Sequence, residues 1–342
     1  MIDLFVPGRL CLFGEHSDWA GEYRSIDSSV ETGQCVITGT DQGIFGSAEL
    51  ASDGLHVTQV LPDGSTGSVQ RYPGDPDRLE EAARAGLFDS YAAGTASVVM
   101  RKYSVSGLRL TIHKRTLPLK KGLSSSAAVC VLTARAFSKV YRLNLSVHEE
   151  MELAYRGELL TGSQCGRMDQ ACALGGGSAL LSFDGDEFSV KPLFPGKPLF
   201  LLIIDLHSAK NTRRILKELY ASFSGGNRQI RDALGRENHR ITFEACRAIE
   251  AGNSQRIGEL MTEAQRVFDE MVAPCCLSEL KAEKLHSVLG CSAAKTYSWG
   301  GKGVGSQGDG TAQFICKGIS ERNRLRDLLE SEQNVTCYNL TM

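Results

Sequence analysis

Residues 118–128 read PLKKGLSSSAA, a glycine followed by three serines and then by an apolar stretch that continues through Phe137. Glycine lets the backbone bend, and the apolar spacing after it predicts a helix over residues 124–140. The first turn of a helix carries unpaired N–H groups and the positive end of the helix dipole, so it attracts phosphate. Three hydroxyls at that position can add hydrogen bonds or reach a magnesium ion. An ordinary serine helix cap is the alternative interpretation.

A second motif lies near the amino terminus, where residues 7–21 read PGRLCLFGEHSDWAG. It places an arginine, two carboxylates and an imidazole within about ten residues, next to a strand-like start. Such a set of groups can bind a polar small molecule. A salt-bridged surface loop is the alternative.

A third motif, GGKGVGSQGDG, occupies residues 300–310. It contains the pattern GxGxxG at Gly303, Gly305 and Gly308. A dinucleotide-binding fingerprint should open a helix early in a βαβ unit, whereas this loop leads into the predicted strand 311–316. The motif therefore does not indicate a dinucleotide fold.

Composition narrows the function classes. The formal charge of −2 comes from 38 basic and 40 acidic residues, so there is no basic excess to neutralise a nucleic acid backbone. The 11 cysteines are scattered without a repeating frame, and no apolar run is long enough to cross a membrane. The first residues lack the pattern of a secretion signal. We expect a cytoplasmic protein that binds neither nucleic acid nor membrane, as a monomer or homodimer.

The chain alternates predicted strands and helices, which indicates a mixed α/β fold. A domain boundary is expected within residues 185–205, where strand-rich sequence gives way to long helical stretches, and we divide the chain into residues 1–190 and 191–342. Strands are predicted near residues 4–6, 35–38, 43–46, 108–113, 178–183, 199–205, 295–299 and 311–316. Helices are predicted over 75–87, 91–100, 124–140, 147–160, 212–223, most of 229–286, and 320–330.

In chain order, the three motifs resemble the signature set of the GHMP kinases, a family named for galactokinase, homoserine, mevalonate and phosphomevalonate kinases. The first motif is similar to the family's P-G-[RK] opening and its sugar-kinase form G-E-H-x-D. The serine loop is similar to P-x-G-x-G-L-S-S-S-A, and the late loop occupies the place of G-x-G-x-G-G. Residues 163–170, SQCGRMDQ, also resemble the galactokinase segment C-G-x-M-D-Q. The resemblance runs from Pro7 to about Cys316.

This resemblance implies a two-domain fold. The amino-terminal ATP-binding domain would be α/β with a left-handed βαβ unit, and the carboxyl-terminal domain would be ferredoxin-like. The active site would lie in the cleft between the domains. Periodicity could not have indicated that handedness, because most crossovers are right-handed.

The resemblance also implies ATP and Mg²⁺ as cofactors of a phosphoryl transfer reaction. Asp169 would act as the base toward the acceptor hydroxyl, and Arg9 would keep that carboxylate ionised. Ser126 and Glu158 would hold the metal, with Glu152 and Glu149 as the alternative acids. The residues implied in ATP binding are Gly122, Leu123, Ser124, Ser125, Ser126, Ala127, Gly303 and Gly305.

The implied substrate-binding residues are Glu15, His16, Asp18 and Gly166. Asp18 favours a sugar, because mevalonate-type members have a less polar continuation after Glu-His. The acceptor would be a hydroxyl of a monosaccharide or sugar derivative, with the anomeric hydroxyl as one candidate. Lys120 stands where the family's loop has a glycine, and Lys121 adds a second cation, which would suit an anionic acceptor. A sugar-phosphate kinase of the heptose 7-phosphate type and a catalytically silent sugar and ATP sensor remain alternatives.

Overall fold

A computed structural model describes residues 1–60, 65–87, 89–118 and 121–342. The chain forms two compact units. Unit 1 comprises Met1–Arg9 and Gly39–Gly176, and unit 2 comprises Leu10–Thr38 and Gly177–Met342. The strands β1 (Ile2–Phe13) and β2 (Gly33–Leu50) have residues in both units. No helix among the described residues is long and apolar enough to cross a membrane.

The strands of unit 1 are the first part of β1, the second part of β2, β3 (Leu55–Gln59), β4 (Gln70–Tyr72) and β5 (Leu108–Arg115). Residues 44–50 of β2 pair antiparallel with β5, and β3 pairs parallel with β5. A parallel pair needs a long crossover connection, and here it contains two helices. These are α2 (Pro76–Arg84) and α3 (Ser90–Tyr103), which confirm the predicted helix pair.

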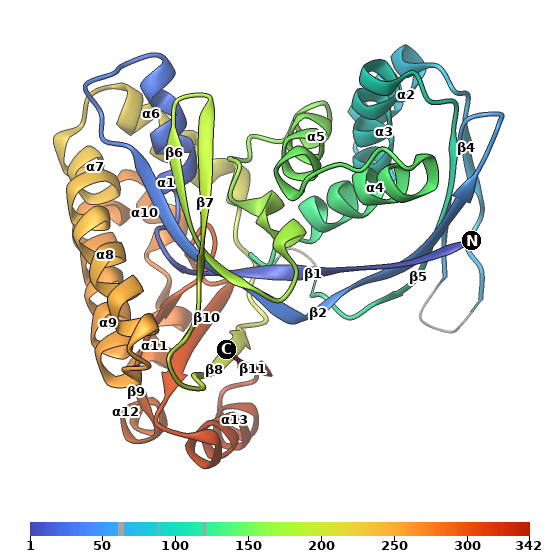
Figure 1. The fold of residues 1–342 in the computed structure, drawn as a ribbon. Coiled ribbons are helices and arrows are strands. Elements are labelled where there is room, and N and C mark those ends of the chain that lie inside the picture. Colours follow the sequence, from blue (N-terminus) through green and yellow to red (C-terminus); the bar gives the residue numbers. More distant parts are fainter. Residues whose placement is uncertain (61–64, 88, 119–120) are drawn as a thin grey trace. The chain divides into compact units, whose positions relative to one another are not determined.

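Two further helices complete unit 1, α4 (Ser125–Tyr141) and α5 (Val147–Leu159), followed by the short helix η2 (Asp169–Leu174). Figure 1 shows α2, α3, α4 and α5 gathered on one side of the strands of this unit. Alanine, valine and leucine make up eight of the 17 residues of α4, and eleven of its residues are buried, so the helix is held in place by packing.

Unit 2 contains a set of three antiparallel strands and a separate four-stranded sheet. Residues 33–38 of β2 pair antiparallel with β6 (Ser178–Asp184), which pairs with β7 (Glu187–Leu193). This pairing explains why residues 10–38 belong to unit 2, so that the compact units do not follow the single boundary that we expected near residue 190. The division into domains 1–190 and 191–342 stays a prediction.

The second sheet has the antiparallel order β11-β8-β10-β9. Its strands are β8 (Phe200–Asp205), β9 (Ser298–Gly303), β10 (Thr311–Cys316) and β11 (Thr336–Thr341). Helices lie between β8 and β9, and α13 (Ile319–Glu332) lies between β10 and β11. The sequence of elements and the strand order are those of a ferredoxin-like sheet, which confirms the expected class of this region.

The helical part of unit 2 lies between β8 and β9. Figure 1 shows α8 and α9 next to each other in this region. A short helical segment before β2 consists of α1 (Ser17–Glu22) and η1 (Tyr23–Ser25). The other helices are α6 (Thr212–Ser224), α7 (Arg228–Asp232), the π-helix η3 (Ala233–Glu237), α8 (Asn238–Glu250), α9 (Ser254–Met271), η4 (Ala273–Cys276), α10 (Leu277–Leu280), α11 (Glu283–Gly290) and α12 (Ser292–Tyr297).

Two predictions about strands were wrong in detail. The expected strand at residues 295–299 is mostly helix α12, and β9 begins only at Ser298. The first glycines of the late loop are therefore strand residues. A Cβ on Gly300 would lie 2.0 Å from the carbonyl oxygen of Gly258, so glycine here permits the close packing of α9 on β9. Near the amino terminus, the separate short strands predicted at 35–38 and 43–46 are parts of the single long strand β2.

Candidate active site

The first candidate centre lies in unit 1 and is built on Arg9 of β1. One guanidinium nitrogen of Arg9 donates to the carbonyl oxygen of Gly122 at 2.7 Å. Another forms an ion pair with the carboxylate of Asp169. A single buried arginine therefore connects the start of the serine loop to the carboxylate that the sequence proposes as a base. Arg9 is 3% exposed, whereas the Asp169 side chain is 26% exposed, so part of that carboxylate remains open.

The loop before Asp169 is anchored on α5 at two points. The guanidinium of Arg167 donates to Glu152 at 3.2 Å and lies 4.3 Å from the centre of the Tyr155 ring. The side-chain amide of Gln170 donates to Glu158 at 2.8 Å. Because its neighbours are fixed in this way, Asp169 is held at the start of η2 with its side chain turned to Arg9. Gly166, a predicted substrate-binding residue, is buried in the same loop.

Glu158 is a fully buried carboxyl next to this centre. Its side chain is hydrogen-bonded to Ser126 and to Gln170. Burial raises the pKa of Glu158 to about 7, and the nearby charge of Asp169 acts in the same direction. The structure thus places Ser126 and Glu158, the two predicted metal ligands, in contact with each other.

The start of α4 has an unusual backbone. Gly122 has φ +70° and Ser124, at the N-cap position, has φ +60°, so both adopt left-handed conformations. The hydroxyl of Ser124 is buried and has no hydrogen-bond partner among the described residues. A buried polar atom without a partner is unfavourable unless a ligand completes it. Ser125 and Ser126 are partly exposed beside it. Leu119 and Lys120, which the sequence analysis included in this loop, lie outside the described residues.

The two acids that were the alternatives to Glu158 as metal ligands have other partners. Glu152 is hydrogen-bonded to Arg156 and Arg167, and Glu149 forms the capping box of α5 with Ser146. Among the described residues, no group of three or more histidine, cysteine or acidic side chains is placed to hold a metal ion. Magnesium in nucleotide sites usually takes only one or two carboxylates and completes its shell with phosphates and water. Ser126 and Glu158 fit that pattern.

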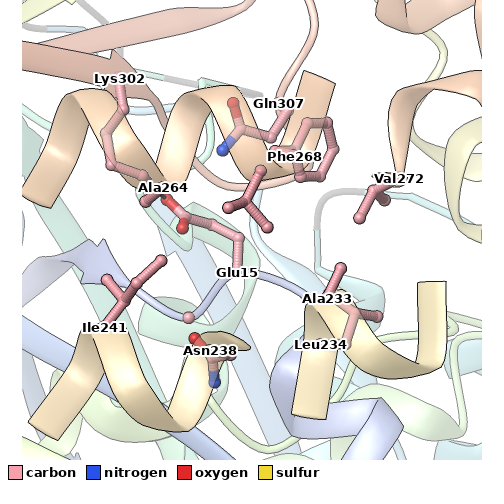
Figure 2. A pocket seen from close by; sticks show the side chains of 12 residues that line it. Glu15, Ala233, Leu234, Asn238, Ile241, Ala264, Phe268, Val272, Lys302 and Gln307 are labelled. Atoms are coloured by element: carbon pink, nitrogen blue, oxygen red, sulfur yellow. Dashed lines mark hydrogen bonds and ion pairs between the residues drawn. The ribbon is translucent and has the colours of Figure 1, made fainter. Parts of the chain in front are cut away.

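The second candidate centre lies in unit 2 and contains the amino-terminal motif. Glu15 follows β1 and forms an ion pair with Lys302 of β9, with the two side chains 4% and 2% exposed. Figure 2 shows the two side chains pointing toward each other in a pocket of unit 2. This partner was missed in the sequence, because 287 positions separate the two residues and nothing in the pattern of the late glycine loop singled out its lysine.

His16 and Asp18 have different surroundings from Glu15. His16 has φ +67°, accepts a hydrogen bond on Nδ1 from the indole N–H of Trp19 at 3.1 Å, and stacks on Phe268 with ring centres 5.9 Å apart. Asp18 is buried in the first turn of α1. These contacts show how the motif is held, and the roles of both residues in substrate binding stay predictions.

The late glycine loop connects β9 to β10. The backbone N–H of Gly303 donates to the side chain of Gln265 at 2.7 Å. The carboxylate of Asp309 accepts from the N–H of Leu285 at 2.8 Å, in the first turn of α11. Lys210 donates to the carbonyl of Gln307 at 2.5 Å. The loop is therefore fixed within unit 2, and the ATP-binding roles of Gly303 and Gly305 stay predictions.

The chain is similar to known kinases in both sequence and fold. Residues 90–177 match the family "GHMP kinases N terminal domain". The chain is 23% identical over 323 residues to a mevalonate kinase of Aeropyrum pernix, covering 92% of this chain and 91% of that protein. It is 24% identical over 305 residues to a galactokinase of Thermotoga maritima, covering 79% and 78%. The fold is similar to that of Lactococcus lactis galactokinase, solved with galactose, with a TM-score of 0.70, 19% identity, and coverage of 99% and 92%.

The match to a GHMP kinase domain and the similarity to a mevalonate kinase and a galactokinase over most of the chain place the protein among the phosphotransferases that use an alcohol group as acceptor. Residues 90–177 thus carry the amino-terminal domain of the GHMP kinases, and the chain as a whole is similar to kinases of that family.

Proposed function

We propose that the protein is an ATP- and Mg²⁺-dependent kinase that transfers the γ-phosphate to a hydroxyl of a monosaccharide or sugar derivative, with the anomeric hydroxyl as a candidate. The observation that carries this proposal is the position of Arg9. Its guanidinium joins Gly122 of the serine loop to Asp169, so the proposed phosphate site and the proposed base belong to one hydrogen-bonded set.

The nucleotide phosphates would be bound at the start of α4. Residues 122–127 offer backbone N–H groups, the positive end of a 17-residue helix and three hydroxyls. The buried, unpartnered hydroxyl of Ser124 supports this role, because a phosphate oxygen would give it the partner that it lacks among the described residues.

Ser126 and Glu158 would hold the metal ion, which offsets the charge of the nucleotide phosphates when it is bound. A divalent cation favours the ionised form of a neighbouring carboxyl group. The raised pKa of Glu158 therefore means that metal binding near neutral pH is accompanied by loss of a proton from this residue.

Asp169 would accept the proton of the attacking hydroxyl or orient that hydroxyl. Arg9 pairs with the carboxylate, and the exposed part of Asp169 leaves room for a substrate hydroxyl. Glu15, His16, Asp18 and Gly166 would serve the acceptor, and the acidic residue at position 18 supports a sugar. Both galactokinases and a mevalonate kinase are among the relatives, so the acceptor must be identified by experiment.

A test of this proposal is ADP release from MgATP with a panel of acceptors. The panel should include neutral monosaccharides, sugar phosphates, uronic acids and mevalonate. ADP formed with a sugar, above the rate without acceptor, supports the proposal. ADP formed with a sugar phosphate alone would favour the alternative kinase, and nucleotide binding without ADP from any acceptor would favour the silent sensor.

A further inference from the structure

Six residues of unit 1 form a closed ring that joins the serine loop, the proposed metal ligands and the proposed base. Neighbours in the ring are linked by a hydrogen bond, by an ion pair or by the chain itself. In order around the ring they are Gly122, Arg9, Asp169, Gln170, Glu158 and Ser126. The sequence predicts a role for five of them and none for Gln170.

Gln170 is a fully buried polar side chain. Its amide nitrogen donates to the carboxylate of Glu158 at 2.8 Å and lies 4.0 Å from the sulfur of Cys165, which is a weak acceptor. Its Oε1 atom is buried and has no partner in the part of the chain that the structure describes. A buried polar atom without a partner is unfavourable, and a leucine here would have no such atom. The hydrogen bond to Glu158 therefore explains why a glutamine occupies this position.

The backbone of α5 beside Glu158 is fixed by close helix packing. A Cβ on Gly157 would lie 2.5 Å from the Cα of Thr95, so glycine lets α5 and α3 approach backbone to backbone. The carbonyl oxygen of Glu158 also accepts from the hydroxyl of Thr161 at 2.7 Å. With the backbone held in this way, the direction of the Glu158 carboxylate depends on its side-chain hydrogen bonds.

The hydrogen bond from Gln170 is made to one carboxylate oxygen of Glu158, Oε2. A carboxylate has about four lone-pair sites, so this bond leaves acceptor positions free for a cation. Neighbours that hold a metal-ligating carboxylate in one orientation typically contribute about 10- to 100-fold to metal affinity or activity. Gln170 has the contact that such a neighbour needs.

Gln170 also directly follows Asp169. Both residues lie in the first turn of η2, and a helical turn keeps adjacent residues in a fixed relation. A hydrogen bond that holds Gln170 to α5 therefore limits the movement of Asp169 as well. On its other side, Asp169 is held by Arg9. One amide thus links the proposed metal ligand on α5 to the proposed base on η2.

We propose that Gln170 is a positioning residue that orients Glu158 for the metal ion and couples this ligand to Asp169. The inference rests on the proposed kinase function and makes it more specific. The other anchor of the same loop provides a contrast, because Arg167 holds the loop through Glu152 and the Tyr155 ring. Loss of that anchor loosens the loop and leaves the hydrogen bond to Glu158 in place.

The test compares the native full chain with Gln170→Leu, which has a side chain of similar size and no proton to donate. Calorimetry measures the affinity for a non-hydrolysable ATP analogue with Mg²⁺ and with a chelator, and the ratio of the two affinities gives the contribution of the metal. We expect Gln170→Leu to reduce this ratio about tenfold and to leave the affinity in chelator unchanged. An equal ratio in both chains, or a native chain whose nucleotide affinity does not depend on Mg²⁺, would overturn the inference.

Hydrogen–deuterium exchange measures the coupling to Asp169. The magnesium complex of the analogue should protect residues 169–174 of η2 in the native chain, and this protection should be lost in Gln170→Leu. Equal protection of η2 in the two chains would overturn the coupling. If Gln170→Leu does not fold, Gln170→Met, which has an unbranched side chain, replaces it in both measurements.

Further variants distinguish orientation of the ligand from general support of the loop. Arg167→Met should leave the metal ratio unchanged, and a loss equal to that of Gln170→Leu would overturn the inference. Adding Gln170→Leu to Glu158→Gln should reduce the ratio no further than Glu158→Gln alone, because the amide acts through this carboxylate. Gln255→Leu is the matched control, since the amide of Gln255 donates to Glu259 at 3.1 Å on an exposed surface, and it should change neither quantity.

The inference and the proposed function can fail separately. Metal-dependent nucleotide binding that Gln170→Leu weakens, without ADP release from any acceptor, would overturn the kinase function and leave the inference standing. ADP release by the native chain, with the same metal ratio in Gln170→Leu, would support a kinase and overturn the inference.

Discussion

Two ion pairs, one in each unit, use the same kinds of groups in different surroundings. In unit 1, Arg9 is buried but its partner Asp169 keeps 26% of its side chain exposed. In unit 2, Lys302 and Glu15 are exposed by only 2% and 4%. Both pairs include a residue that lies in β1 or directly follows it, Arg9 within the strand and Glu15 two residues after its end.

The difference in exposure indicates different roles for the two carboxylates, Asp169 and Glu15. A carboxylate that is held by an arginine and still reaches solvent can exchange a proton with a bound hydroxyl. The carboxylate of Glu15 is instead buried against Lys302, and either ion left alone in that position would be strongly destabilised. We therefore propose that Asp169 takes part in proton transfer and that Glu15 takes part in recognition of the acceptor, and the following predictions test that division.

The largest effect is expected from Asp169→Asn. The amide keeps the size of the side chain but cannot accept a proton, so kcat should fall roughly 10³- to 10⁴-fold. Binding of the nucleotide should be retained, because residues 122–127 are unchanged. Steady-state ADP release and calorimetric titration with a nucleotide analogue measure the two quantities. Asp184→Asn, which alters the more exposed Arg24–Asp184 pair, is the control, and near-normal turnover of Asp169→Asn would remove its assignment as the base.

The next largest effect concerns folding stability and compares the two cations directly. Lys302→Met leaves the Glu15 charge buried and unpaired, which should lower the free energy of unfolding by about 3–5 kcal/mol. Arg9→Met should cost less, about 1–2 kcal/mol, because the partly exposed Asp169 can be hydrated. Urea denaturation of both variants gives the two values.

A double variant distinguishes the effect of an unpaired buried charge from the effect of lost side-chain packing. Adding Glu15→Gln to Lys302→Met removes the unpaired charge and should restore most of the lost stability. Equal destabilisation by the two single variants, with no rescue, would show that exposure does not distinguish the pairs.

An intermediate effect is expected from Glu158→Gln and depends on pH. The folded state raises the pKa of Glu158 from 4.5 to about 7, through burial and the nearby Asp169, while Arg9 opposes the shift. The folded protein therefore holds this proton more tightly than the unfolded chain does. Stability falls as the pH rises from about 4.5 to about 7 and then levels off.

Glutamine stays neutral throughout that range. Glu158→Gln without nucleotide should therefore be more stable than the native chain at pH 8 by about 3 kcal/mol, and about equally stable at pH 4.5. The same variant should bind the magnesium–nucleotide complex more weakly, because it loses a proposed ligand. Thermal unfolding across pH and calorimetry check both outcomes. If the native chain loses no stability between pH 4.5 and pH 8, the raised pKa of the buried Glu158 is contradicted.

The smallest effect is expected from Ser124→Ala. The hydroxyl has no partner among the described residues, so its removal should change the stability of the free protein by less than about 1 kcal/mol. If the hydroxyl binds a phosphate oxygen, nucleotide affinity should fall roughly tenfold. Ser331→Ala, at the end of α13, is the control. Equal nucleotide affinity in native and Ser124→Ala proteins would remove this contact from the site.

The sequence indicated the unit 1 centre well because its parts are local motifs. The serine run predicted a helix start, and α4 begins at Ser125. The arginine and the aspartate were proposed as neighbours from the family resemblance, and the structure pairs them. Ser126 and Glu158 were proposed together on the same ground and are in contact.

The unit 2 centre could not be predicted in the same way. Glu15 was identified, but its partner Lys302 lies in a glycine loop that was interpreted through its glycines alone. Gly300 of β9 permits close packing against α9, and Gly301 permits close packing against Phe314 of β10, so both roles depend on elements outside the glycine motif. The left-handed conformation of Gln307 and the π-helix at residues 233–237 also have no sequence signal that we could use.

The most direct test is hydrogen–deuterium exchange of the whole chain with ligands added one at a time. Our account predicts that a magnesium complex of a non-hydrolysable ATP analogue protects residues 122–128 at the start of α4. A neutral sugar that binds should instead protect residues 14–19 and 233–241 of the unit 2 pocket. Protection of the unit 2 pocket by the nucleotide, with residues 122–128 unchanged, would contradict the assignment of the phosphate site to the serine loop.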